Sequence, residues 1–274
     1  MATQGKTQLG TMVNWLRSND IAILGIAIIV AIAAWYLVAS LFPYGLLVFP
    51  HEMVTEVLDL FQRNLAIPHL TATLSRTLVG FVGATAIGIA VGVIMGINNF
   101  GLEFLTPYVF LALTLPGVAW AAVLTIAMGF GFWTPVAVVA VTAWPFVSLI
   151  VWKGVEDIDR DLILMSESFN IPRRRLLFRT IFPNVAPSLF SAIRYGIVIS
   201  WSIETNAEIF ATNNGIGFKI VEAYNAYQYN RAFAWAFLFL FVVLILEFGI
   251  LRPIERRVYS YRRNVDFEVV GRNQ

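Results

Sequence analysis

The chain has 274 residues, of which 58% are hydrophobic and only 13% are charged, and its mean hydropathy is +0.74. A soluble domain is about 45–50% apolar and about 25% charged, so a water-exposed globule of this composition could not cover its surface with polar groups. The absence of cysteine excludes disulfides, cysteine-ligated zinc, iron–sulfur clusters and a thiol nucleophile. The net charge of +2, with localised basic residues, gives no sign of nucleic-acid binding.

Six segments are apolar enough to cross a bilayer, whose hydrocarbon core of about 30 Å needs roughly 20 residues of helix. They are Ile21–Phe42, Val79–Ile97, Phe104–Met128, Thr134–Trp152, Leu189–Phe210 and Phe233–Leu251. We therefore predict an all-α membrane protein with six transmembrane helices in one domain. The first twenty residues are too polar for a signal-peptide core, so we expect the first span to insert and to stay.

Two local patterns lie between the first span and the end of the second. Apolar residues on one helical face predict a short amphipathic helix along the membrane interface. These residues are Val54, Val57, Leu58 and Phe61. Small residues recur at every fourth position of the second span, at Gly80, Ala84, Gly88 and Gly92. This smooth face favours close packing of helices within one bundle.

Lysine and arginine are concentrated in alternate connecting segments. With the N-terminus inside, two lie before the first span, six between residues 153 and 187, and six from Arg252 onward. Fourteen of the 19 are then cytoplasmic, in agreement with the excess of basic residues in cytoplasmic loops. The distribution predicts a multi-pass protein with both termini in the cytoplasm. The glycine- and tyrosine-containing segment 211–230 then becomes a folded outer loop that could meet another protein.

The segment between the fourth and fifth spans, residues 153–187, is unusually long. Its apolar residues recur at helical spacing with charges between them. A connection that only joined two spans could be a few residues long, so we expect this segment to dock a partner protein. Covering the cytoplasmic end of its own bundle is the alternative.

Residues 164–183 resemble the cytoplasmic loop of binding-protein-dependent ABC importer permeases. The usual form is Glu-Ala-Ala, three residues, Gly, and then about nine residues to an Ile-x-Leu-Pro-like end. With Phe182-Pro183 as the anchor, Asn170 takes the glycine position, and asparagine is the residue that best tolerates positive φ after glycine. The Glu-Ala-Ala positions are occupied by Leu164, Met165 and Ser166, so the usual acid is missing.

Further matches to this family follow in the right order along the chain. They are TATLSRT at 71–77, LPGVAW at 115–120, MGFG at 128–131, NAE at 206–208 and NGIG at 214–217. The subfamily that the sequence resembles most is that for nitrate, sulfonate, taurine and bicarbonate importers, which also includes permeases for thiamine precursors and aromatic acids.

The resemblance implies the permease (transmembrane) subunit of an ATP-driven importer in the bacterial cytoplasmic (inner) membrane. It would form the translocation path for a small polar solute, of the nitrate, sulfonate, taurine or bicarbonate class or a small aromatic or heterocyclic compound. The implied partners are two copies of an ABC ATPase, a second and most simply identical permease, an extracytoplasmic substrate-binding protein, and membrane lipid. The implied division is a cytoplasmic N-terminal segment (1–20), a first helix with an outer interfacial segment (21–70), the transmembrane core (71–255) and a cytoplasmic tail (256–274).

The same resemblance implies a coupling helix at about Asp161–Asn170, seated in a groove of the ATPase. The residues expected at this contact are Leu164, Met165, Phe169, Asn170, Arg173, Arg174 and Arg175. A solvated cluster that obeys the positive-inside rule explains the three arginines equally well.

Four residues are candidates for the translocation path: Trp120, Trp201, Glu204 and Glu208. Ionisable residues inside membrane spans are costly and face a cavity or a partner. Glu204 and Glu208 share one helical face, and only Glu208 matches an acidic position of the family. If both line the path ionised, they disfavour a small anion; a structural pairing with Arg76 is the equally weighted alternative. The two tryptophans are at least as well explained as packed core residues.

Other classes of function find less support in the sequence. The chain lacks a Gly-x-x-x-x-Gly-Lys-[Ser/Thr] phosphate loop, so ATP hydrolysis is expected on a partner chain. His51 and His69 form no metal-ligand pair at helical spacing, and no catalytic constellation is found, so we expect neither an enzyme nor a cofactor. A stand-alone secondary transporter is the remaining alternative, although it usually shows an internal repeat.

Overall fold

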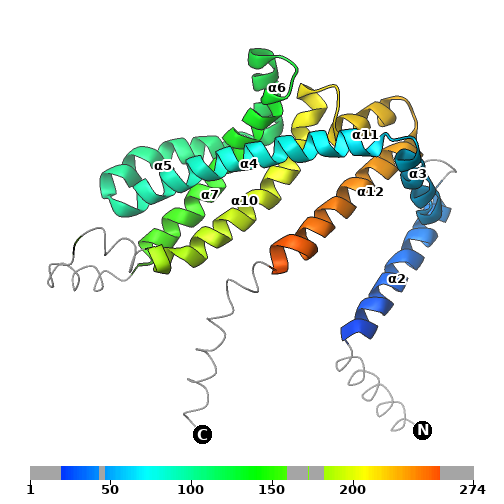
Figure 1. Ribbon diagram of the computed structural model, residues 1–274, viewed down its shortest axis with the longest axis horizontal. Coiled ribbons are helices and arrows are strands. Elements are labelled where there is room, and N and C mark those ends of the chain that lie inside the picture. The colour runs from blue at the N-terminus through cyan, green and yellow to red at the C-terminus, as the bar shows by residue number, and fades with distance from the viewer. Residues whose placement is uncertain (1–19, 43–46, 159–171, 173–181, 254–274) are drawn as a thin grey trace, which may run out of the picture.

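The computed structural model describes residues 20–42, 47–158, 172 and 182–253 (Figure 1). Within these ranges the chain is helical and contains no strand. The helices are α2 (Asp20–Leu41), α3 (Pro50–Gln62), α4 (Ala66–Ile97), α5 (Asn99–Thr114), α6 (Gly117–Met128), α7 (Trp133–Glu156), α10 (Phe182–Ala211), α11 (Ile216–Asn225) and α12 (Tyr229–Leu246), followed by the π-helical turn η2 (Glu247–Leu251).

The all-α prediction is confirmed, and the predicted spans coincide with helices, the third with two helices that are separated by a break. Among the described residues, three helices are long and apolar enough to cross a membrane by themselves: α4, α7 and Tyr229–Gly249. The pair α5 and α6 makes a fourth candidate if it counts as one broken span. The total of six spans therefore remains a prediction. The second segment is much longer than expected, because α4 begins at Ala66 and extends over 32 residues.

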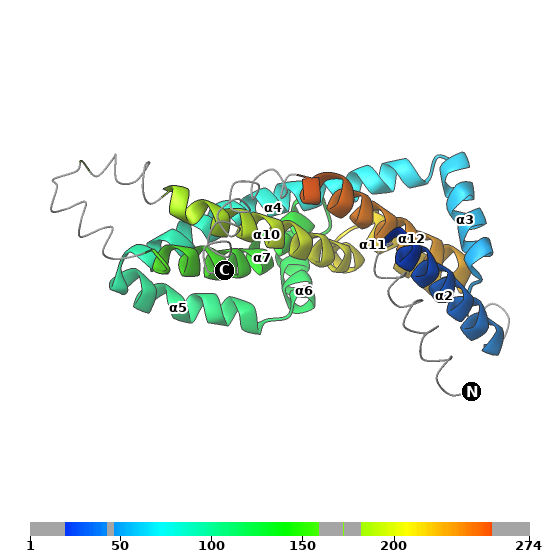
Figure 2. The same ribbon diagram turned by 90° about the horizontal axis from the view of Figure 1, so that it is seen from below.

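The break between α5 and α6 lies at the Leu115-Pro116 step of the predicted third span. Leu115 has extended backbone angles (φ −80°, ψ 121°), as expected for a residue before proline, where the α region is disfavoured. The two helices consequently meet at 93°, and Figure 2 shows α6 turning away from α5. Pro107 and Pro145 lie inside α5 and α7, which continue past them.

The centre of the bundle is the contact between α4 and α7, which the glycines of α4 make possible. A Cβ atom on Gly88 would lie 2.6 Å from Cβ of Val147 and 2.7 Å from the carbonyl oxygen of Trp144. A Cβ atom on Gly80 would lie 2.7 Å from Cβ of Val139. The two backbones therefore approach more closely than any larger residue would allow, and the prediction of close packing within the bundle is confirmed. Helix α10 packs against both α4 and α7 (Figures 1 and 2).

The predicted amphipathic helix exists as α3, which packs near α11 and α12 at one end of the bundle. Its inward residues are Met53 and Leu60, which are buried. Leu60 belongs to an apolar cluster with Trp235 of α12 and Ile216 of α11. Three residues of the predicted apolar face, Val54, Leu58 and Phe61, are exposed, whereas the fourth, Val57, packs against this cluster. This exposed apolar face suits a helix that lies against lipid.

Candidate functional site

The acid predicted at the end of the fifth span, Glu208, lies in a buried polar cluster between α4, α10 and the turn that leads to α11. Its Oε1 atom accepts hydrogen bonds from Nη1 of Arg76 at 3.0 Å and from Oγ1 of Thr73 at 2.8 Å. Its Oε2 atom accepts a hydrogen bond from the backbone N–H of Gly217 at 2.9 Å. Glu208 thus has the ion pair with Arg76 that the sequence suggested as one alternative.

The same arginine also fixes the turn between α10 and α11. Arg76 donates from Nη1 to the carbonyl oxygen of Asn214 at 3.2 Å, and from Nη2 to the side-chain oxygen of Asn214. The N–H of Gly215 donates to Nδ1 of His69, and that of Ile216 donates to Oγ1 of Thr73, at 3.0 and 2.9 Å. Three residues of α4 therefore bind a segment that lies more than 130 residues later in the chain.

The Asn-Gly-Ile-Gly sequence at 214–217 follows from this arrangement. Gly215 has a φ of 107°, a left-handed conformation that favours glycine. A Cβ atom on Gly215 would overlap the carboxylate of Glu208, and one on Gly217 would overlap the carbonyl oxygen of Thr205. Only glycine at these two positions lets the turn close over the buried carboxylate.

The opposite charges of Arg76 and Glu208 form an ion pair inside the protein. The side chains of Arg76 and Glu208 are 5% and 0% exposed, so neither charge is compensated by water. Burying two ions costs several kcal/mol each, and the attraction between them offsets that cost only when further hydrogen bonds satisfy the remaining groups. Thr73, Asn214 and Gly217 supply most of those hydrogen bonds, whereas Nε of Arg76 has no hydrogen-bond partner within the described residues. The cluster therefore holds α4 against α10 and the turn before α11.

Glu204 lies one turn before Glu208 and is also fully buried. Neither of its carboxylate oxygens has a hydrogen-bond partner within the described residues. Trp201 is buried and stacks on Phe239 of α12, with ring centroids 5.5 Å apart. Trp120 is half-buried and packs against the apolar cluster between α4, α7 and α10. All four predicted path residues thus lie in or beside packed regions of the single chain, and their assignment to a path remains a prediction.

A polar stripe on the opposite face of α10 was missed by the sequence reasoning. Ser202 and Asn206 are exposed, between the exposed apolar residues Val198 and Phe210. Nδ2 of Asn206 donates to the carbonyl oxygen of Ser202 at 2.9 Å. The signal was present in the sequence as a pair of polar residues four positions apart within an apolar helix. It was overlooked because the two glutamates, with the same spacing, carry the stronger chemical cue.

The residues predicted to contact an ATPase, Leu164, Met165, Phe169, Asn170, Arg173, Arg174 and Arg175, lie outside the described residues. The helices on either side are described. Val155 and Ile158, at the end of α7, share an apolar cluster with Val185 of α10, and Leu189 packs against it. The chain therefore leaves the bundle and returns to it at the same end.

No group of three or more histidine, aspartate or glutamate side chains within the described ranges is placed to hold a metal ion. The described part of the chain thus contains a helix bundle with a buried ion pair and an exposed polar stripe on one helix.

Comparison with known proteins places this arrangement among transport proteins. The profile of a family described as "Binding-protein-dependent transport system inner membrane component" matches residues 84–258, more than half of the chain. The nitrate import permease protein NrtB of Synechocystis sp. is 31% identical over 156 residues, which are 57% of this chain and 56% of that protein. The chain thus spans little more than half the length of this relative.

Two further comparisons cover more of the relative. The taurine transport system permease protein TauC of Escherichia coli is 24% identical over 258 residues, which are 92% of this chain and 94% of that protein. A solved structure described as inward-facing conformations of the MetNI methionine ABC transporter superposes with a TM-score of 0.59 at 19% identity. It covers 71% of this chain and 94% of that chain, so the two share a fold.

Proposed function

We propose a solute path for this chain, which belongs to the family of inner membrane components of binding-protein-dependent transport systems and is the permease subunit of an ABC importer. In this proposal the translocation path is lined by the exposed stripe of α10 that carries Ser202 and Asn206. The family membership also favours an importer subunit over a stand-alone secondary transporter.

The stripe is the single observation that supports this placement. Polar side chains on the exposed face of a membrane helix are costly against lipid, so they face water or another protein. Ser202 and Asn206 are exposed in the single chain, and a second copy that packs near α10 would enclose a path between two such stripes. We therefore propose an identical second permease, with Tyr195 and Val198 of the same exposed face close to the contact.

The proposed solute is a small anion or zwitterion, of the kind named in the nitrate and taurine relatives. From the sequence alone, a small anion is disfavoured if Glu204 and Glu208 both line the path in ionised form. Both side chains are fully buried, and Glu208 is paired with Arg76. A path lined by a hydroxyl and an amide carries no such charge, and both groups can donate hydrogen bonds to a nitrate or sulfonate oxygen.

We further propose that segment 159–181 docks a separate ATPase and that both termini lie in the cytoplasm. The basic residues of this segment and of the tail support that orientation. The apolar cluster of Val155, Ile158 and Val185 supports a mechanical role, because it joins both ends of the segment to α7 and α10. A push on the segment would then reach α10 directly, as rigid-body switching of a packed bundle requires.

The test uses the natural absence of cysteine in this chain. In membranes containing the whole importer, an Asn206→Cys variant is exposed to a charged, membrane-impermeant methanethiosulfonate, with and without ATP. We expect labelling in at least one of the two states, because a path residue is reached through water. Saturating solute should slow that labelling.

Two matched variants give the controls. Leu240→Cys, exposed on α12 among apolar residues, faces lipid and should resist the reagent, as should Glu204→Cys, which is buried. If Asn206→Cys resists in both states, or labels no faster than Leu240→Cys, the stripe does not line the path.

A further inference from the structure

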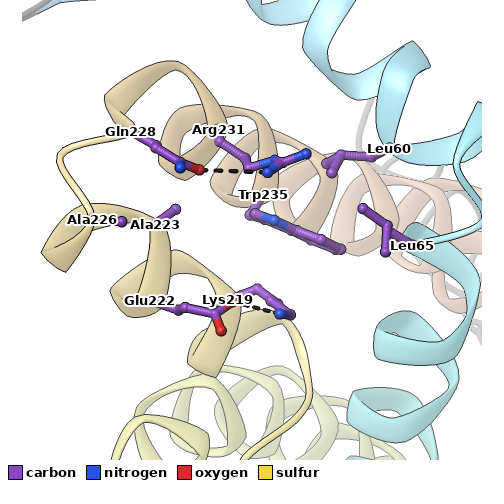
Figure 3. Close-up of a pocket in the computed structure, with 9 residues that line it drawn as sticks. All are labelled: Leu60, Leu65, Lys219, Glu222, Ala223, Ala226, Gln228, Arg231 and Trp235. Atoms are coloured by element: carbon purple, nitrogen blue, oxygen red, sulfur yellow. Dashed lines mark hydrogen bonds and ion pairs between the residues drawn. The ribbon is translucent and has the colours of Figure 1, made fainter.

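A cavity opens between α3, α11 and α12 (Figure 3), and the residues of the polar stripe of α10 do not line it. Its volume is about 340 Å³, and Lys219 of α11 and Arg231 of α12 lie on opposite sides of Trp235 in its wall. A second cavity of about 490 Å³ shares Arg231 and adds Glu56 and Asp59 of α3, together with Arg63, to the lining. Arg231 therefore lies between two adjoining spaces.

Within the described part of the chain, the guanidinium of Arg231 has only long polar contacts. Its Nη1 atom donates to Oε1 of Gln228 at 3.4 Å, and its Nη2 atom lies 3.9 Å from Oδ2 of Asp59. Asp59 is held more closely by Arg63, at 2.8 Å. A guanidinium has five N–H donors, and good hydrogen bonds to oxygen are 2.7–3.2 Å long. Arg231 is only 31% exposed and is thus a sheltered cation with most of its donors available.

Lys219 supplies a second cation to the same cavity. Its ammonium pairs with Glu222, which leaves further N–H donors because an ammonium has three. Glu222 lines the same cavity and offsets one of the two positive charges. The guanidinium and the ammonium still suit a group with several negatively charged oxygens, such as a phosphate.

The cavity lies where one surface of the membrane is expected. Helix α4 begins at this end, α10 ends here and α12 begins here. Exposed tyrosines, Tyr224 and Tyr227, mark the same region, and tyrosines gather at membrane–water interfaces. The exposed apolar face of α3, residues Val54, Leu58 and Phe61, would lie against acyl chains next to the cavity.

From this arrangement we propose that the cavity binds the headgroup of a zwitterionic phospholipid that carries a primary ammonium, as in phosphatidylethanolamine. The phosphate lies between Arg231 and Lys219, and the ammonium lies against Glu56 and Asp59. A site for a simple anion would not need those two acids beside Arg231. The bound headgroup would also reinforce the attachment of α3 to α12, where the direct contact of Asp59 with Arg231 is long.

The test is native mass spectrometry of the purified full-length chain in detergent, with phosphatidylethanolamine, phosphatidylglycerol or phosphatidylcholine added. We expect selective retention of phosphatidylethanolamine, reduced about tenfold in Arg231→Gln and in Lys219→Gln, the effect of losing one charged hydrogen bond. Arg231→Lys should retain an intermediate amount. Lys153→Gln, which removes an exposed lysine from α7, should behave like the parent chain.

Three results would overturn the proposal. Equal retention of phosphatidylglycerol or phosphatidylcholine would show that the ammonium is not recognised. Displacement of the lipid by millimolar inorganic phosphate would indicate a site for free anions. Undiminished binding in the Arg231→Gln variant would place the lipid elsewhere.

Discussion

Arg76 and Glu208 join parts of the chain that are far apart in sequence, and both of their side chains are buried. A buried ion pair is costly to break from one side, because the remaining charge stays buried without a partner. At the scale of residues, stability therefore depends on the pair and its surrounding hydrogen bonds together.

We expect Arg76→Gln and Glu208→Gln to lower the free energy of unfolding by about 3–5 kcal/mol each. The double variant should lose clearly less than the sum of the two, because it leaves no unpaired charge. Thermal unfolding of the purified chain in detergent measures all three. Glu156→Gln, which breaks an exposed pair with Lys153, should cost no more than about 1 kcal/mol. Additive losses in the double variant would contradict the coupling.

Two glycines of α4 distinguish the packed face of the helix from its other faces. Gly88 meets Val147 and Trp144 of α7, whereas a Cβ atom on Gly83 would lie 3.6 Å from Cβ of Ala140, an ordinary contact. Packing of small residues allows the two helix backbones to approach, and this approach is lost if the smooth face acquires volume. At the scale of elements, the α4–α7 contact is therefore sensitive to one methyl group.

We expect Gly88→Ala to destabilise the bundle by about 1–3 kcal/mol, the usual cost of overpacking. Gly83→Ala should be neutral or should stabilise it by up to about 1 kcal/mol, because alanine is the better helix former. The thermal midpoints of the two purified variants give the comparison. An equal effect of both substitutions would show that the helix contact is not as close as described.

In the proposed mechanism, events at the 159–181 connection must reach the proposed solute path. The two ends of that connection, at Ile158 and Phe182, adjoin α7 and α10, and α10 continues to the polar stripe and to Glu208. One continuous helix of 30 residues thus links the proposed ATPase contact to the proposed path. At the scale of the whole molecule, α10 is the element best placed to transmit movement.

We expect Met165→Glu or Phe169→Glu to reduce ATP-driven uptake by about tenfold or more, because a charge buried in an apolar contact is costly. Co-purification with the ATPase should fall in parallel. Glu167→Gln, in the same segment, is the matched control and should retain both activities. Normal uptake by both glutamate variants would remove these residues from the ATPase contact.

The helical character of every predicted span could be read from the sequence, since a run of apolar residues in lipid must satisfy its own backbone hydrogen bonds. Pro116 indicates a break, because proline restricts the residue before it, but Pro107 and Pro145 carry the same signal and lie inside continuous helices. The angle of 93° between α5 and α6 could not be predicted from the sequence, because it depends on what each helix packs against. The start of α4 at Ala66 was missed because the polar residues of its first turns conceal a helix that is stabilised by contacts with other segments.

Helix α10 shows most clearly which features follow from the local sequence pattern and which depend on the tertiary structure. The sequence by itself predicted a membrane helix at Leu189–Phe210 with Glu204 and Glu208 on one face, and it missed the second polar pair of this helix, Ser202 and Asn206. At about 100° per residue the two pairs lie almost on opposite faces, and nothing in their spacing says which face is buried. Only the tertiary structure decided this, because Arg76 and Thr73 of α4 and the turn at Gly217 bind Glu208 and so turn the other pair outward.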